Sequence, residues 1–375
     1  MKNKAHQVAG NASVQKTWQV DSLPFEVRAE DMAGLSQESR QRLESLVAEG
    51  GSTDLVARVR AFVRDPCHGG ADVYRRRDIA RDLGREAACA VQDLSVVADL
   101  VIAGRAGEGI AYPREFGEGM AEAASEIRPV WDALVQAIER HADGKGRGID
   151  LLKAFLDGVC QRDQALFNAL LDEALDRPAL RAWIPRLQIR RSRLDHAGCE
   201  RLLKLVGDEA VPKTAFFPLY EVTSYGWSNE QLVKLVVGMS ARGKQWWDWL
   251  LLMLGHFYEA RFWGIPDGNV LPPDEAVREA VVESLLEGMR AGWDCADHNL
   301  EDVIRVVLAG EDARAHALRF IEGIRCWIEL ERPCWRHLGD VIRTLGELHP
   351  EIVQDVLVGD DTDDVAADRR RMLAG

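Results

Sequence analysis

The sequence lacks any apolar run long enough to cross a membrane. The aromatic stretch Trp246–Tyr258 has 13 residues and is already interrupted by Asp248 and His256, whereas a spanning helix needs about 20 mostly apolar residues. The opening segment MKNKAHQVAGNASVQKTWQVD also has no apolar core of the kind that a secretory signal requires. We therefore expect a cytoplasmic protein with a polar N-terminal tail over residues 1–21 and no membrane partner.

The sequence also lacks a recognisable disulfide or metal framework. Its seven cysteines are an odd number and include no C-x-x-C pair, which favours reduced thiols. Two C-x-x-H pairs lie 39 residues apart and could together form a tetrahedral zinc site. They are Cys295 with His298 and Cys334 with His337. Because such pairs often arise by chance, we assign no metal and keep this zinc site as an alternative.

Signatures of catalysis are scarce. No G-x-S-x-G elbow occurs, and no cysteine–histidine spacing singles out a thiolate and its base. Residues 238–244 fit G-x-x-x-x-G-K, but Gln245 stands where a phosphate-binding loop needs Ser or Thr for Mg²⁺. We interpret Gly243 as a helix stop, and the short glycine pairs 107/109 and 117/119 as loops. We assign no catalytic residue and no cofactor, and keep a cryptic nucleotide- or zinc-dependent enzyme as an alternative.

Positive charge is in deficit, with 47 Lys and Arg against 61 Asp and Glu, a formal charge of −14 and a pI of about 5.2. A uniformly acidic surface repels phosphate backbones, so nucleic acid is a disfavoured partner. Two arginine clusters depart from this background. The first contains Arg75, Arg76, Arg77, Arg81 and Arg85, and the second contains Arg181, Arg186, Arg190, Arg191 and Arg193.

The ordinary interpretation of these arginine clusters is a solvated, salt-bridged face. Docking of an acidic protein partner, or of nucleic acid, is the alternative, because arginine suits planar carboxylate and phosphate recognition.

Strand-type alternation is hard to find, whereas the helical period recurs along the chain. Four sets of apolar residues follow the i, i+3, i+4, i+7 spacing and a fifth follows i, i+3, i+7, i+10, and each spacing places one stripe on a helix. These sets are 152/155/156/159, 167/170/171/174, 232/235/236/239, 300/303/304/307 and 335/338/342/345. Helix starts are indicated by capping residues before apolar runs: Asp163, Asp195, Ser228 (with Gln231 as a capping box), Asp274 and Asp297.

From about residue 150 a helix pair spans roughly 35–40 residues, which is typical of stacked helical-hairpin arrays. We predict an all-α fold, a right-handed α-solenoid of the HEAT/armadillo kind with about 16 helices. The expected divisions are an N-terminal helical region (22–141), a hinge (142–149), a repeat array (150–358) and a mobile acidic tail (359–375).

The aromatic segment over residues 246–263 holds four tryptophans, two phenylalanines and a tyrosine. Its apolar side chains cover most of the helix circumference, which predicts a helix buried between neighbours. Tryptophan and tyrosine are also the residues most often found at binding hot spots. Tyr258 and Trp263 are therefore retained, with the arginine clusters, as candidate partner-binding residues.

The segment LLKAFLDGVCQRDQALFNALLDEALDRPALRAWIPRLQ (151–188), preceded by FGEGM (116–120) and WDALV (131–135), resembles the helical-repeat region of large bacterial multidomain NTPases of the STAND-like class, many of them linked to phage defence. In that family an ATPase module drives oligomerisation, and the helical array senses a ligand or packs on other domains. The resemblance implies a non-enzymatic recognition or scaffold module that binds another protein in a bacterial stress or defence system. A nucleic-acid-binding repeat protein is the alternative.

Overall fold

The computed structural model describes residues 36–37, 41, 54–64, 73–103, 112–141, 147–190, 193–222, 224–262, 272–293, 299–329 and 338–358. The chain forms two compact units, one before and one after the Phe167–Asn168 bond. The hinge predicted at 142–149 stays a prediction, because residues 142–146 lie outside the described residues, as do both predicted tails. In the described part of the chain, the one β-sheet is a parallel pair of two-residue strands.

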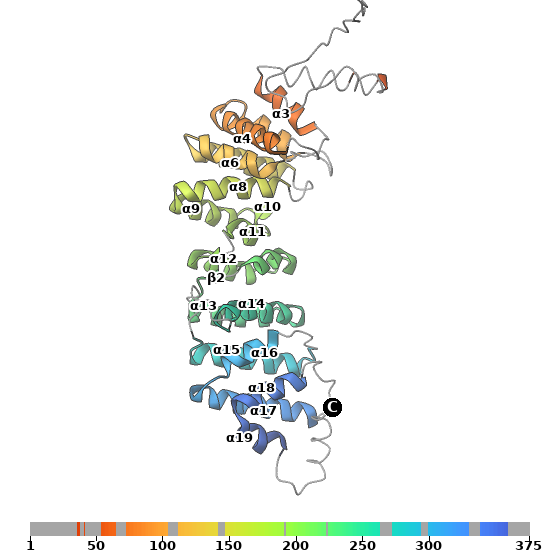
Figure 1. Ribbon diagram of the computed structural model, residues 1–375, viewed down its shortest axis with the longest axis vertical. Coiled ribbons are helices and arrows are strands. Elements are labelled where there is room, and N and C mark those ends of the chain that lie inside the picture. Colours follow the sequence, from red (N-terminus) through yellow and green to blue (C-terminus); the bar gives the residue numbers. More distant parts are fainter. Residues whose placement is uncertain are drawn as a thin grey trace, which may run out of the picture. The chain divides into compact units, whose positions relative to one another are not determined.

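The first unit is built from helices joined by short connections. They are α3 (Leu55–Arg64), α4 (Val73–Cys89), α5 (Leu94–Ile102), α6 (Pro113–Ala123), α7 (Ile127–Arg140) and α8 (Arg147–Arg162), with α9 (Gln164–Leu175) running across the boundary. Helices α4, α6 and α8 pack one on the next (Figure 1). Helix α3 packs on α5 and α5 on α7, which forms a neighbouring row. This alternation is the arrangement of stacked helix pairs.

The second unit also contains two rows of successively packed helices. Its elements are α10 (Pro178–Arg181), α11 (Ile184–Gln188), β1 (Arg193–Leu194), α12 (His196–Val206), η1 (Lys213–Glu221), β2 (Ser224–Tyr225), α13 (Asn229–Ala241), α14 (Lys244–Phe262), α15 (Glu275–Arg290), α16 (Asn299–Val307), η2 (Glu311–Ala313), α17 (Arg314–Glu329), α18 (Leu338–Leu348), α19 (Pro350–Val353) and the π-helical segment η3 (Gln354–Val358). Helix α13 packs on α15 and α15 on α17, while α14 packs on α16 and α16 on α18.

The spacing of polar contacts between helices reflects this repeated pairing. Arg140 bonds Asp99 across 41 residues, Arg319 bonds Glu279 across 40, and Thr344 bonds Glu301 across 43. These separations match one helix pair plus its connections. The predicted all-α class with stacked helix pairs is therefore confirmed, while the handedness and curvature of a solenoid stay predictions.

The predicted helix starts are confirmed wherever the structure describes them. Asp195 accepts a hydrogen bond from the Gly198 amide, Asp274 accepts one from Val277, and Asp163 accepts one from Leu166. Ser228 and Gln231 form the reciprocal capping box. These side-chain oxygens satisfy amide groups that the first helical turn leaves without partners. Asp297 lies outside the described residues.

The apolar stripes form the cores of the two units. Every member of the first four stripes is buried. In the fifth stripe Leu338 and Leu345 are buried, Ile342 is half-buried and Trp335 lies outside the described residues. The aromatic helix α14 is buried as predicted, with Trp246, Trp247, Trp249, Phe257 and Tyr258 all inside. Among the described residues, no helix has both the length and the apolar content that crossing a membrane requires.

Helices α4 and α6 approach so closely that backbone touches backbone. A Cβ placed on Gly119 would fall against the carbonyl oxygen of Arg81, and one on Gly84 against the carbonyl oxygen of Phe116. Gly117 permits a similarly close approach of α6 to α8, because a Cβ on Gly117 would fall against the Leu151 carbonyl oxygen.

The interpretation of the 117/119 glycine pair as a loop is therefore wrong. Both glycines lie inside α6, where the missing side chains permit dense helix packing. The 107/109 pair lies outside the described residues.

Candidate functional site

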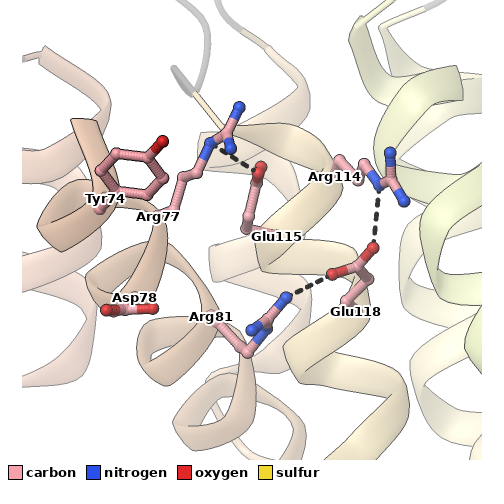
Figure 2. Close-up of a pocket in the computed structure, with 7 residues that line it drawn as sticks. All are labelled: Tyr74, Arg77, Asp78, Arg81, Arg114, Glu115 and Glu118. Atoms are coloured by element: carbon pink, nitrogen blue, oxygen red, sulfur yellow. Dashed lines mark hydrogen bonds and ion pairs between the residues drawn. The ribbon is translucent and has the colours of Figure 1, made fainter.

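An open pocket of about 440 Å³ lies between α4 and α6 in the first unit (Figure 2). Seven residues line it: Tyr74, Arg77, Asp78 and Arg81 from α4, and Arg114, Glu115 and Glu118 from α6. We call this feature the α4–α6 pocket. Its lining is almost wholly polar, with three guanidinium groups, three carboxylates and one phenol.

The helical period explains why these side chains meet. Residues 74, 77, 78 and 81 stand at i, i+3, i+4 and i+7 on α4, so they share one face. Residues 114, 115 and 118 occupy the facing side of α6. The close approach at Gly84 and Gly119 brings the two faces together, so short-range ion pairs can form across the gap.

Three ion pairs cross or follow this gap. Arg77 Nε lies 3.2 Å from Glu115 Oε1. Arg81 Nη2 lies 2.6 Å from one oxygen of Glu118, and Arg114 Nε lies 2.9 Å from the other. Partial burial raises the pKa of Glu118, but hydrogen bonds from Arg81 and Arg114 outweigh that effect and hold the pKa below its ordinary value. Glu118 is therefore ionised at neutral pH and fixes both guanidinium groups.

The exposures of these groups are unequal, and this decides what a ligand meets first. The side chains of Arg77 and Arg114 are 50% and 78% exposed, whereas those of Glu115 and Glu118 are 14% and 26% exposed. Tyr74 beside them is 79% exposed. Arg77 and Arg114 are thus more accessible than their partner carboxylates, so the pocket presents positive charge and an aromatic ring to solvent. Asp78, which is exposed, is the exception.

The structure divides the first arginine cluster of the sequence. Arg77 and Arg81 line the pocket, and Arg85 continues the row through a 2.6 Å contact with Glu122. Arg75 is exposed on α4, whereas Arg76 is buried.

In the second arginine cluster, Arg181 forms contacts within its own unit. Arg181 contacts Asp208 at 2.8 Å and donates to the Leu175 carbonyl. Arg186 and Arg190 are half-buried, and Arg193 is exposed in β1. Arg191 lies outside the described residues. None of the described arginines of this cluster lines the α4–α6 pocket.

The remaining candidates separate into buried and undescribed residues. Tyr258, which was predicted as a hot spot, is fully buried in α14, so in this structure it contributes to the core. Trp263, Cys295, His298, Cys334 and His337 lie outside the described residues. Among the residues that the structure describes, no group of three or more His, Cys, Asp or Glu side chains is placed to hold a metal.

The segment 238–244 spans the end of α13, the connection after it and the first residue of α14. Gly238 lies inside α13, and Gly243 adopts a φ of +87° between α13 and α14. The interpretation of Gly243 as a helix stop is therefore confirmed, because this left-handed conformation suits glycine.

Sequence reasoning missed Tyr74, Asp78 and the whole α6 side of the pocket. A signal for part of it was present. Glu115, Glu118 and Glu122 follow Arg77, Arg81 and Arg85 by 38, 37 and 37 residues, which is one predicted repeat period. Pairing charged stripes one period apart would have linked the first arginine cluster to its acidic counterpart.

Comparisons with protein-family models, with curated proteins and with solved structures found no match for this chain. The resemblance to the helical-repeat region of STAND-like NTPases therefore stays a prediction.

Proposed function

We propose that this chain is a non-enzymatic recognition module that binds a segment of another protein in the α4–α6 pocket. The observation that carries the proposal is the unequal exposure of charge in that pocket, where Arg77 and Arg114 are accessible and their partners Glu115 and Glu118 are largely covered. An exposed tyrosine adjoins these arginines. Arginine and tyrosine are enriched at the residues that dominate protein–protein binding energy.

Preorganisation is the physical basis of the proposed mechanism. Binding usually costs the ordering of long side chains. Here Glu115 and Glu118 already hold Arg77, Arg81 and Arg114 in place, and dense helix packing holds the two helices. A partner then meets donors whose positions are set before it arrives.

The stacked helix pairs would serve as the rigid support for this pocket. We further propose that the array is a right-handed solenoid and that the module acts in a bacterial stress or defence system, as the resemblance of residues 151–188 suggests. Nucleic acid is a poorer candidate ligand, because the pocket lining has equal numbers of Arg and acidic residues and the chain carries a net charge of −14.

Photo-crosslinking tests the proposed function. Benzoylphenylalanine at position 74 places a reactive aromatic group at the pocket edge, and the same residue at exposed Val96 on α5 is the matched control. In native lysate we expect a discrete protein adduct from position 74 that is absent from position 96 and is lost when Arg77→Gln is added. Identical adducts from both positions, or none from position 74, would contradict the proposal. An adduct removed by nuclease would assign the pocket to nucleic acid.

A further inference from the structure

We propose that the occupant of the α4–α6 pocket is an acidic peptide segment, whose carboxylates bind the terminal nitrogens of Arg77 and Arg114 while its chain passes over Tyr74. This inference rests on the proposed function and adds the chemistry of the partner. Three observations support it: the arginine nitrogens that already contact carboxylates, the charges that are accessible to solvent, and the carboxylates paired with those arginines.

The atoms already in use leave a defined set of donors. Arg77 contacts Glu115 through Nε, and Arg114 contacts Glu118 through Nε (Figure 2). In the described structure, neither guanidinium has a further ion pair through its terminal nitrogens. The planar guanidinium presents these nitrogens as a fork that matches a carboxylate. Each arginine is thus fixed by one acid and can bind a second.

The accessible charge favours an anion over a cation. A basic side chain entering the pocket would have to pass Arg77 and Arg114 before reaching Glu115 and Glu118, which are largely covered. Asp78 is the accessible carboxylate of the lining. It lies on the α4 side, where it can accept a hydrogen bond from a backbone N–H of the bound segment and disfavour a second acidic group at that edge.

The carboxylates of the lining favour acidic side chains over phosphates. Glu115, Glu118 and Asp78 balance the three arginines of the lining, so a monoanionic carboxylate is repelled less than a phosphate that carries more charge. A polynucleotide also needs several phosphates neutralised along its length, while the pocket lining has equal numbers of Arg and acidic residues. Tyr74 offers an exposed ring against which a peptide chain can pack.

The test is direct binding of a fluorescein-labelled hexaglutamate peptide to the full chain, followed by fluorescence anisotropy at low salt. Because each change removes a charge-assisted hydrogen bond, Arg77→Gln and Arg114→Gln should each weaken binding roughly tenfold or more. Arg77→Lys should also weaken binding, since lysine keeps the charge but lacks the fork. The control is Arg128→Gln, which removes an exposed arginine paired with Asp132 on α7.

Several results would overturn the inference. These are no binding of hexaglutamate by a folded wild-type chain, tighter binding of hexalysine, or equal weakening by Arg128→Gln. Binding of oligothymidylate that depends on Arg77 and Arg114 would assign the pocket to nucleic acid instead. Circular dichroism confirms that each variant is folded. If hexaglutamate fails while the crosslink from position 74 persists, only this inference falls. If hexaglutamate binds but no crosslink forms, the proposed function falls.

Discussion

Replacing Gly119 by alanine tests the close packing of α4 and α6 on which the pocket depends. A Cβ at this position would collide with the backbone carbonyl oxygen of Arg81. Since the obstacle is backbone and not the end of a flexible side chain, the collision is relieved only when the two helices move apart. That movement would loosen the buried Phe116 and Met120 and would separate Arg81 from Glu118.

Two opposing effects set the magnitude. Alanine in an unobstructed helix interior is more stable than glycine by about 0.5–1 kcal/mol. Overpacking a dense interior costs about 1–3 kcal/mol and sometimes more, and a backbone collision belongs at the upper end. We therefore expect Gly119→Ala to lower the free energy of unfolding by about 2 kcal/mol. The matched control is Gly346→Ala in α18, where a Cβ would meet nothing within 4 Å; it should raise that free energy by about 0.5–1 kcal/mol.

Urea unfolding followed by far-UV circular dichroism measures both free energies. Because the chain forms two compact units, the loss of stability from Gly119→Ala should appear in the unfolding transition of the first unit, which contains the buried Trp131. The gain from Gly346→Ala should appear in the transition of the second unit. If Gly119→Ala is as stable as the wild type, or gains stability as the control does, the close approach of α4 and α6 is refuted.

Four further substitutions probe the second unit. Asp172→Asn weakens the partner of the buried Arg201 guanidinium, so it should lower the free energy of unfolding in urea by about 1–3 kcal/mol. The lower end of that range is expected because the Asp172 side chain is 58% exposed. Arg201→Met removes the buried charge itself and should lower that free energy by less. A hydrogen bond from Arg305 holds the pKa of Glu301 below its ordinary value; partial burial opposes this effect and a hydrogen bond from Thr344 adds to it. The contribution of Glu301 to stability is therefore present at neutral pH and is lost as the pH falls through the lowered pKa. Glu301→Gln should flatten the acid side of a stability–pH profile, and an unchanged profile would contradict this. Gly243→Ala should lower the free energy of unfolding by about 1–2 kcal/mol, because φ is +87° there. No neighbour obstructs the new methyl group, so the backbone conformation alone sets this loss. A neutral result in thermal unfolding would show that the turn can adopt another conformation.

Local features of the fold could be predicted from the sequence because they depend on neighbouring residues. The stripe at 152/155/156/159 is buried as expected, and Ser228 caps α13 as expected. Both follow from the 3.6-residue period and from the needs of a helix end. The Gly243 stop is of the same kind.

Features that depend on which helices become neighbours could not be predicted in this way. Gly117 and Gly119 look like loop residues until α4 and α8 are placed on either side of them. The pocket has the same origin, because Arg77 and Glu115 meet only after α4 and α6 pack. Arginine clustering indicated one wall of the pocket, and the opposite wall required the repeat offset of 37–38 residues.

The most direct test of the proposed recognition is to identify the chemistry of whatever reacts with benzoylphenylalanine at position 74. The crosslinked adduct can be digested and its partner peptide sequenced by mass spectrometry. A peptide rich in Asp and Glu, recovered from the wild-type background and lost with Arg77→Gln, is the predicted result. A basic or uncharged peptide, or a nucleotide in its place, would contradict the account.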